Sequence, residues 1–480
     1  MSRISRRDFM VAAAAAAVAR PSILDGRGLP AVARTAKAGQ RSAADPWVRA
    51  RAIVESITVP RFPSRDFEIT RYGAVGDGVA SCTSAIGKAV AACRAAGGGR
   101  VVVPRGRYLT GAVCLESGVN LHLAEGATLA FSAAPADYPL VFTRWEGVEL
   151  MNYSPFIYAF EAENIAITGT GTLDGQAGPD RWWNWRGTGA ARGARQTSGR
   201  TRLFDMQARG VPVAERIFGD GHFLRPNFIQ PYRSRNVLID GVTIVNSPMW
   251  EIHPVLCRSV TVRNVTITSH GPNNDGCNPE SCRDVLIERC SFDTGDDCIA
   301  LKSGRNDDGR RLNVPVENVV IRDCSMKDGH GGVVIGSEIS GGARNVFAER
   351  CRMDSPRLDR ALRMKTNSVR GGVIEGVYMR DVTVGQVAEA VVTIDFFYEE
   401  GDSGKYPPTV RDVEVRNVTS RKSQYALLLR GYGHAPITGV RIVDCRFDGV
   451  EKADVLEAVR DLELANVSIN GKALTSRITR

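Results

Sequence analysis

The chain has 480 residues, of which 43% are hydrophobic and 24% are charged, and its formal net charge is +9. This composition excludes a disordered or fibrous protein and supplies enough apolar side chains for a large core. The segment from Met1 to Gln40 holds seven Lys or Arg and two Asp, a surplus of five, so the rest of the chain carries only +4. The basic residues do not form the stripe expected of a nucleic-acid-binding protein, so we predict no nucleic-acid partner.

Residues 1–35 have the layout of an export signal and linker. The segment Ser5-Arg6-Arg7-Asp8-Phe9-Met10 precedes an apolar run, Val11 to Ala19, that is too short to span a bilayer. The paired arginines resemble a twin-arginine signal, which directs export and does not anchor the protein. We therefore expect a periplasmic or extracellular protein with no membrane anchor after signal removal. Residues 36–480 are expected to form a single domain.

The first expected elements of that domain are a strand, a turn and a helix. Glu68 begins a short strand that is followed by Gly-rich turn residues up to Gly78. An Ala-rich helix then ends at about Ala96, before glycines 97–99. Four strand-like segments follow, each separated by Gly or Pro: Arg100 to Pro104, Tyr108 to Val113, Val119 to Leu123 and Ala127 to Phe131.

From residue 164 onward the chain repeats the pattern Asx-Val-x-Ile-x-x-(Val/Cys)-x-(Ile/Phe/Met). The first apolar residue of the pattern marks each successive copy. These residues are Val237, Val260, Val285, Val319, Val346, Val377, Val413, Val440 and Leu462. Each copy alternates like a strand and leaves no room for a long helix. Because one copy cannot bury its apolar face alone, the repeat predicts an all-β solenoid, a right-handed parallel β-helix with the short N-terminal helix capping its open end. The alternative, a β-sandwich, has turns about every 8 to 12 residues.

The cysteines number 11, an odd count. Four of them occupy the repeat position that valine holds in other copies: Cys290, Cys324, Cys351 and Cys445. We therefore expect these four cysteines to pack as small apolar residues in one ladder inside the solenoid. A disulfide between Cys290 and Cys298, or one involving Cys277 or Cys282, is the alternative. Cys and His are not grouped at metal-binding spacing, so we predict no metal site and no cofactor.

A long interruption, at about residues 176–231, separates two copies of the repeat. Long excursions from a solenoid often shape the binding site, so we expect this insertion to rise beside it. Trp182, Trp183 and Trp185 lie within it. Their rings are suited either to stacking on sugars or to forming a small local core.

Three acids recur at the spacing of the repeat. Asp296 and Asp297 follow Asp275 at the length of one copy, and His330 follows Asp296 at the length of the next. Neighbouring coils lie about 4.8 Å apart, so these residues are expected to stand side by side. Thr294-Gly295 offers a bend that would aim both adjacent acids at one site. Carboxylates this close cannot all ionise normally, and a protonated acid beside an ionised base suits glycosidic hydrolysis.

Two cations follow one coil further on. Arg363 follows His330 at about the length of one copy. Arg363 and Lys365 flank Met364, so on a strand both cations point the same way while Met364 points inward. A pair of cations on one exposed face beside three acids is suited to binding an anionic substrate group.

Four motifs resemble the signature motifs of glycoside hydrolase family 28, the polygalacturonases: Asn273-Asn274-Asp275, Gly295-Asp296-Asp297, Gly329-His330-Gly331 and Arg363-Met364-Lys365. Their order and spacing agree with the family, and the segments from Tyr72 to Gly78 and from Leu121 to Leu129 resemble its N-terminal part. The resemblance implies hydrolysis of α-1,4-galacturonosyl bonds, with a pectic polysaccharide or oligogalacturonide as substrate.

The resemblance also implies roles for the acids. Asp296 would be the general acid that protonates the leaving oxygen, and Asp275 and Asp297 would activate the attacking water. His330 would orient or tune the acid pair. Inversion at the anomeric carbon would follow if the carboxylates stand about 6.5 to 9.5 Å apart, which leaves room for a water.

Four further residues are expected to bind the substrate. Arg363 and Lys365 would hold the galacturonate carboxylate, and the resemblance adds Asn273 and Tyr398 as substrate-binding residues. The full set of His and Arg-x-Lys motifs favours galacturonate at the cleavage site.

Two positions depart from the family pattern. Asn274 stands where many members have Thr, and this asparagine resembles exo-acting bacterial members; Asn278 stands where Asp is common. We expect Asn278 to weaken a support of Asp275. Exo action is favoured because the insertion at 176–231 would wall off one end of the cleft.

Three alternatives stay open at this point. One is a hydrolase of another pectic polymer such as rhamnogalacturonan. Another is a pectate lyase on the same solenoid, in which the same acids would bind Ca²⁺. The last is a non-catalytic solenoid adhesin, for which the convergence of the acids would be coincidental.

Overall fold

The structure is a computed structural model, and it describes residues 45–186 and 195–478. These residues belong to one compact unit that begins at Asp45. The expected export signal, residues 1–35, lies outside the described residues. Within the described ranges, no helix combines the length and the apolar composition needed to cross a membrane.

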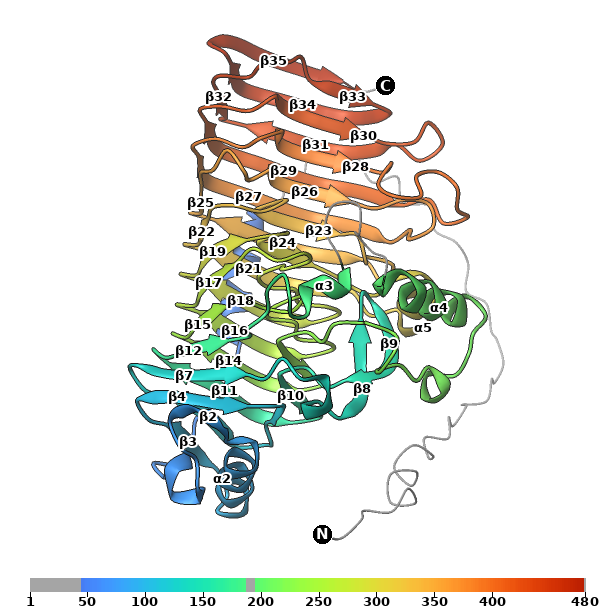
Figure 1. Ribbon diagram of the computed structural model, residues 1–480. Helices are drawn as coiled ribbons and strands as arrows, with labels where there is room; N and C mark the ends of the chain where they lie inside the picture. Colours follow the sequence, from blue (N-terminus) through green and yellow to red (C-terminus); the bar gives the residue numbers. More distant parts are fainter. Residues whose placement is uncertain (1–44, 187–194, 479–480) are drawn as a thin grey trace, which may run out of the picture. The chain divides into compact units, whose positions relative to one another are not determined.

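The fold is a right-handed parallel β-helix, as the repeat predicts (Figure 1). The valines that mark successive copies are direct partners across parallel strands, because Val237 pairs with Val260, Val260 with Val285 and Val285 with Val319. Equivalent residues of neighbouring coils therefore stack in ladders. The sequence repeat sets the register of the sheet.

Four sheets make up the described fold. The largest takes one or two strands from each coil: β1 (Asp66–Glu68), β2 (Asp77–Ser81), β3 (Gly99–Val103), β4 (Gly106–Thr110), β6 (Val119–Leu123), β7 (Ala127–Phe131), β11 (Glu163–Gly169), β12 (Thr172–Asp174), β14 (Arg235–Asp240), β15 (Thr243–Val245), β16 (Arg258–Arg263), β17 (Thr266–Ser269), β18 (Arg283–Glu288), β19 (Ser291–Thr294), β21 (Val316–Arg322), β22 (Ser325–Met326), β24 (Ala343–Glu349), β25 (Arg352–Met353), β27 (Val373–Val384), β29 (Thr409–Ser420), β31 (Ile437–Val443), β32 (Arg446–Phe447), β34 (Val459–Ile469) and β35 (Lys472–Ile478). The six-stranded sheet, here called the site sheet, contains β20 (Ile299–Leu301), β23 (Val333–Gly336), β26 (Arg360–Lys365), β28 (Ala390–Asp395), β30 (Tyr425–Arg430) and β33 (Val455–Glu457). The smaller sheets are β5 (Val113–Cys114), β10 (Ile157–Phe160) and β13 (Ile229–Tyr232), and the hairpin of β8 (Leu140–Trp145) and β9 (Val148–Tyr153).

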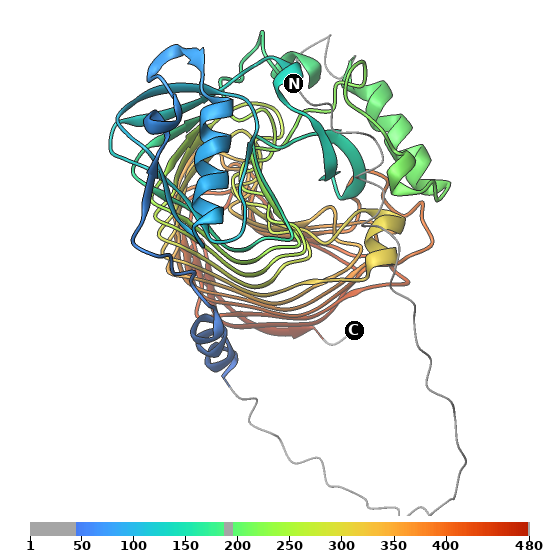
Figure 2. The ribbon, with the colours of Figure 1, turned by 90° about the horizontal axis from the view of Figure 1, so that it is seen from below.

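The helices are peripheral to the coils. They are α1 (Pro46–Ser56), α2 (Thr83–Ala95), α3 (Trp183–Arg186), α4 (Gln196–Ala208) and α5 (Asn306–Leu312), with the 3₁₀ turns η2 (Ile69–Tyr72), η3 (Pro135–Asp137) and η5 (Val213–Glu215). Helix α2 matches the expected N-terminal helix and lies across the end of the coils (Figure 2). Its buried face, which includes Ile86 and Val90, joins the main core. It therefore covers apolar side chains that the first coil would otherwise expose.

Helix α1 was not predicted from the sequence. The side chain of Asp45 caps it by accepting a hydrogen bond from the amide of Trp47 at 3.0 Å. The Trp47 ring packs edge to face on Phe347, one of three outward-facing apolar residues of the large sheet that the helix covers. The other two are Leu286 and Val320. These three residues are direct partners on β18, β21 and β24, so α1 binds a row that the stacking itself creates.

The backbone conformation at the Asx position explains why the repeat has Asn or Asp there. Asn236, Asp284, Asn318, Asn345, Asp412 and Asp461 all adopt φ between 52° and 61°. Asn and Asp tolerate this left-handed conformation better than other non-glycine residues, and Gly376 and Gly439 replace them in two copies. The side chains also stack, because Asn318 donates to Asp284 at 2.8 Å and Asn345 donates to Asn318 at 3.0 Å.

The interior of the coils is apolar, and the cysteines are part of it. Cys290, Cys324, Cys351 and Cys445 are buried in the main core cluster, as the repeat predicts. All eleven cysteines lie in the described part of the chain and all are free thiols. The disulfide alternatives involving Cys298, Cys277 or Cys282 are therefore wrong.

Candidate active site

Seven of the eight residues expected from the sequence line one pocket of about 360 Å³. They are Asn273, Asp275, Asp296, His330, Arg363, Lys365 and Tyr398. The eighth, Asp297, is fully buried beneath the pocket and contacts Lys365 and Arg363 from below. One oxygen of each of the three aspartates lies within 4.8 Å of the others. The convergence of the acids is as their spacing predicts.

The acids stand in the turns that lead from the large sheet into the site sheet. Asp275 follows β17, and Asp296 and Asp297 lie between β19 and β20. Gly295 allows the two turns to touch, because a Cβ atom on it would lie 2.4 Å from the carbonyl oxygen of Gly271. The bend expected at Thr294-Gly295 is therefore a close approach of two coils that only glycine permits.

Asn274 is a structural residue of the first turn. Its side chain is fully buried, accepts hydrogen bonds from Ser269 and from the amide of Gly271, and donates to the carbonyl oxygens of Ser247 and Met249. A threonine could not satisfy these four partners with one hydroxyl. Asn274 thereby fixes the turn that carries Asp275.

Asp296 is paired with His330 from the next coil. The Nδ1 atom of His330 lies 3.0 Å from the Oδ1 atom of Asp296, and the same oxygen accepts a hydrogen bond from the amide of Asp297 at 2.9 Å. Backbone pairing sets this geometry, because the amide of His330 donates to the carbonyl of Asp296 at 3.1 Å. The spacing between the two residues is thus one turn of the coil.

Asp297 is paired with the two cations of β26. The ammonium group of Lys365 donates to its Oδ2 atom at 2.7 Å, and a guanidinium nitrogen of Arg363 lies 3.6 Å from its Oδ1 atom. Met364 between them is fully buried in the core, as the alternation predicts. The sequence spacing suggested that Arg363 stands beside His330. In the structure Arg363 is in register with Val334, so the cations lie further along the coil than His330.

Asp275 is supported from the other side. Asn278 donates a hydrogen bond to its Oδ2 atom at 3.0 Å, and the ammonium group of Lys302 lies 3.6 Å from the same atom. The expectation that Asn278 weakens a support of Asp275 is wrong, since an amide donor stabilises the carboxylate and an aspartate here would repel it. Sequence analysis also missed Lys302, which strand alternation after Leu301 could have indicated.

Charge is unevenly distributed over the acids. Burial and the charge of Asp296 raise the pKa of Asp275 well above its ordinary value. Burial also acts to raise the pKa of Asp296, but the hydrogen bond and charge of His330, with the nearby lysines, outweigh it and hold that pKa below its ordinary value. The bond to Asp296 raises the pKa of His330 from 6.5 to about 9. Of Asp275 and Asp296, Asp275 is therefore the one whose surroundings favour the protonated form, while His330 and Asp296 form an ion pair. The spacing of the acids predicted that one of them keeps a proton, without indicating which one.

The carboxylates are closer together than the sequence analysis required for inversion. Their nearest oxygens lie within 4.8 Å, whereas an inverting pair is usually separated by about 6.5 to 9.5 Å. The carboxylate separation on which the prediction of inversion depended is therefore not found between these oxygens. The stereochemical outcome therefore stays a prediction from the resemblance alone.

Asn273 and Tyr398 reach the pocket by different means. Asn273 adopts φ +57°, and its side-chain oxygen accepts a hydrogen bond from the fully buried Arg225 at 2.7 Å. The ring of Tyr398 lies 5.6 Å from the guanidinium carbon of Arg363 and 5.3 Å from the ammonium nitrogen of Lys365. Both residues border the pocket beside the cations.

A buried charge network extends from Lys302 to the rim. Lys302 donates to Glu338 at 2.9 Å, and Arg305 donates to Glu338 at 3.2 Å and to Glu399 at 3.3 Å. Burial lowers the pKa of Lys302, but the charges of Glu338 and Asp275 more than reverse this and hold it above its ordinary value. Lys302 is thus a fixed cation behind Asp275.

The insertion forms one wall of the pocket. Arg186 of α3 and Gln196, Thr197, Arg200 and Thr201 of α4 line it, together with Glu146 from the turn of the hairpin β8–β9. Figure 1 shows α3, α4, α5 and this hairpin along one side of the coils. The insertion therefore rises beside the site, as expected.

The three tryptophans of the insertion do not line the pocket. Trp182 is buried in the main core against Tyr138 and Phe156, and Trp183 and Trp185 are partly buried against the same core. Trp183 also donates a hydrogen bond to the carbonyl of Ser247 at 2.8 Å. Of the two interpretations, the local core is the one that the packing supports.

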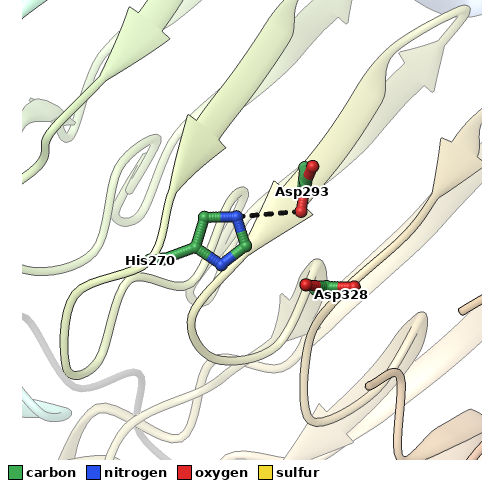
Figure 3. A group of neighbouring side chains, drawn as sticks. All are labelled: His270, Asp293 and Asp328. Carbon is green, nitrogen blue, oxygen red and sulfur yellow. Dashed lines mark ion pairs between the residues drawn. The ribbon is translucent and has the colours of Figure 1, made fainter. Parts of the chain in front are cut away.

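Two groups of side chains have donor atoms that could hold a metal ion. One is the aspartate triad, but each carboxylate already has a protein cation within 3.6 Å. The other consists of His270, Asp293 and Asp328, each from a different coil (Figure 3). His270 pairs with Asp293 at 2.9 Å, and Asp328 pairs with Arg357 at 2.6 Å. A metal ion would have to displace these pairs.

Comparison with known proteins identifies the family. The model of the family described as Glycosyl hydrolases family 28 matches residues 220–467, more than half of the chain. The chain belongs to this family. Among solved structures, an exopolygalacturonase from Thermotoga maritima is 42% identical, with a TM-score of 0.86 over 90% of this chain and 99% of that one.

Two curated members of the family are more distant in sequence. The "Probable polygalacturonase" of Vitis vinifera is 29% identical, and the match covers 77% of this chain and 72% of that protein. The "Exo-poly-alpha-D-galacturonosidase" of Dickeya chrysanthemi is 28% identical, over 74% of this chain and 62% of that protein. These similarities agree with the motifs that suggested the family from the sequence.

Proposed function

We propose that this protein is an exo-acting polygalacturonase, which hydrolyses the terminal α-1,4-galacturonosyl bond of pectic chains. The observation that carries the proposal is the pocket in which three aspartates converge beside Arg363 and Lys365. The similarity to exopolygalacturonases supports the substrate class. Family membership supports hydrolysis as the reaction.

The cations select the substrate in this proposal. Arg363 and Lys365 project from β26 into the pocket beside Tyr398. A galacturonate carboxylate would replace part of their pairing with Asp297, and the planar guanidinium is suited to a bidentate contact. A neutral sugar could not make this contact, so galacturonate is favoured over galactose.

Proton transfer follows from the pairing of the acids. The proton that His330 holds at rest passes to Asp296 as the glycosidic bond breaks, and Asp296 donates it to the oxygen of the leaving sugar. Asp297 accepts a proton from the attacking water, whose oxygen forms the new bond to the anomeric carbon. Asp275, whose pKa is raised by burial and by the charge of Asp296, orients that water. Solvent exchange after product release returns the proton from Asp297 to His330.

Exo action is supported by the walls of the pocket. Residues of α3 and α4 and the turn at Glu146 surround the acids on one side, whereas the site sheet continues on the other through β28, β30 and β33. An internal cleavage site needs room for the chain on both sides. The chain end would therefore lie against the insertion.

The alternatives are less compatible with the same atoms. In a Ca²⁺-dependent lyase, the aspartates would have to exchange Lys302, His330 and Lys365 for the metal ion. A hydrolase of rhamnogalacturonan would not need Arg363 and Lys365 at the cleavage site. An adhesin would have no use for an acid with a raised pKa beside an ion pair.

We further propose that the protein is exported, on the basis of Arg6 and Arg7 followed by an apolar run. Replacing both arginines by lysine is expected to retain the protein in the cytoplasm. Fractionation of the producing cells measures this, and unchanged export would contradict a twin-arginine route.

Product analysis tests the function. Purified protein is incubated with polygalacturonate and with digalacturonate, with and without a chelator. We expect saturated galacturonate monomer from both substrates, at rates that the chelator leaves unchanged. Unsaturated products that depend on Ca²⁺ would establish a lyase, and internal cleavage of the polymer would refute exo action. NMR of the first product reports whether the anomeric configuration is inverted.

A further inference from the structure

A second cleft lies on the same sheet as the catalytic pocket. It has a volume of about 350 Å³ and is bordered by Arg360 of β26, Thr393 and Asp395 of β28, and Tyr425, Leu428 and Arg430 of β30. Thr393 is the direct strand partner of Arg363, which lines the catalytic pocket. The two clefts therefore adjoin across one step of the sheet, about 4.8 Å.

The position of the cleft fits the path of the substrate. The insertion walls the catalytic pocket on one side, so a chain whose end is held there must leave on the other side, over β28 and β30. The outward-facing residues of these two strands form the floor of the second cleft. This step rests on the proposed function, because it needs a polymer in the pocket.

The charges of the cleft are already compensated. Asp395 accepts three hydrogen bonds from Arg430, at 2.8, 2.9 and 3.2 Å, and Arg360 is paired with Glu389. Among the described residues that line the cleft, both cations are thus held by carboxylates, and Glu457 adds a further negative charge. A free galacturonate carboxylate would find no available cation here, whereas Arg363 lies 3.6 Å from Asp297 without a hydrogen bond to it.

The cleft also contains an unused polar group and an aromatic ring. The hydroxyl of Thr393 is buried, and its residue is only 2% exposed, yet the hydroxyl has no hydrogen-bond partner. A buried polar group without a partner costs stability, so a ligand hydroxyl or carbonyl could supply the missing bond. The half-buried ring of Tyr425 offers a face for a sugar.

We propose that this second cleft is a subsite for an uncharged sugar unit of the substrate chain, downstream of the bond that is cleaved. The unit is either a methyl-esterified galacturonate or a neutral sugar, since both lack the carboxylate that the cleft disfavours. The Thr393 hydroxyl bonds to this unit and Tyr425 packs against it. The enzyme would therefore process chain ends of partly esterified or mixed pectin.

The test compares Thr393→Val with a matched control. Thr261, on β16 of the large sheet, is likewise buried, at 1% exposure, with an unpartnered hydroxyl, so Thr261→Val makes the same change away from the cleft. Neither variant removes a hydrogen bond of the described fold, and thermal melting checks that both stay folded. The substrates are digalacturonate, tetragalacturonate, its form with methyl esters on the downstream units, and a tetramer with downstream rhamnose.

Wild-type protein is expected to have a higher kcat/KM on one or both uncharged tetramers than on free tetragalacturonate. Thr393→Val should lower that kcat/KM about five- to tenfold, the effect of one lost hydrogen bond, and leave digalacturonate unchanged. Comparison of the ester with the rhamnose tetramer identifies which unit is bound. Equal effects of Thr393→Val on dimer and tetramers, or a preference for the free tetramer, would overturn the subsite. Failure to release galacturonate from digalacturonate would instead refute the proposed function.

Discussion

The pairing of His330 with Asp296 gives a quantitative prediction for the pH dependence of activity. The bond to Asp296 raises the pKa of His330 from 6.5 to about 9. If the protonated imidazole supplies the proton for the leaving group, kcat/KM should be level between pH 6.5 and 8.5. Above pH 9 it should fall about tenfold for each pH unit, because each unit deprotonates about nine-tenths of the remaining imidazolium. An unperturbed histidine would already have lost most of its activity at pH 8.

Lys365 and Tyr398 do not produce the same limb. The pKa values of Lys365 and Tyr398 are raised above their ordinary values of 10.5 and 10.0, so both groups titrate above His330. The same shift gives His330 a stabilising contribution that is complete below pH 6.5 and is lost as the pH rises through about 9. Because its side chain is 51% exposed, this contribution to stability is small.

The assay is the initial rate of galacturonate release from digalacturonate between pH 4 and 10.5. His330→Gln should lower kcat/KM by about 10² to 10⁴-fold and remove the alkaline limb. His434→Gln is the matched control, because this histidine is 58% exposed and lies outside the pocket. A limb centred near pH 6.5 in the wild type, or an unchanged limb at about pH 9 in His330→Gln, would refute the reasoning.

Three further substitutions probe the buried groups of the site. Asp296→Asn is expected to lower kcat by about 10² to 10⁴-fold with unchanged thermal melting, and substantial residual turnover in a single-turnover assay would exclude it as the acid. Lys302→Met leaves Glu338 without one of its cations, so it should lower the free energy of unfolding in urea by about 3 to 5 kcal/mol; a change below about 1 kcal/mol would mean that the pair is not buried in solution. Glu251 is fully buried, no cation of the described chain lowers its pKa, and burial raises that pKa well above the ordinary value against the opposing effect of Ser269. The folded protein therefore loses stability as the pH rises through the raised pKa of Glu251. Glu251→Gln should accordingly raise the melting temperature more at pH 8 than at pH 4. Equal changes at the two pH values would contradict the assignment.

The sequence predicted the architecture because the architecture is periodic. The Asx-Val pattern places an αL-tolerant residue and a core valine at the same point of each coil, and both requirements are local. Stacking then follows without knowledge of distant contacts. For the same reason, the spacing of Asp275, Asp296 and His330 was sufficient to predict that they converge.

Features outside the repeat needed the tertiary structure. Helix α1 packs on residues that are distant from it in the sequence. Its position depends on the contact between Trp47 and Phe347 of β24. The insertion has no periodicity to predict its path, and Arg200 of α4 is fixed only by its contact with Glu146 of the hairpin β8–β9. Pairs of this kind depend on where loops meet, which composition and spacing do not encode.

The state of the acids was likewise decided in three dimensions. The motifs indicated that one of the aspartates keeps a proton, but they could not tell which one. Burial and the charge of Asp296 raise the pKa of Asp275 against the opposing charge of Lys302, while the hydrogen bond from His330 holds the pKa of Asp296 low. A pKa depends on solvent access and on the nearest charges, so the sequence alone determined the set of acids and the folded chain assigned their charges.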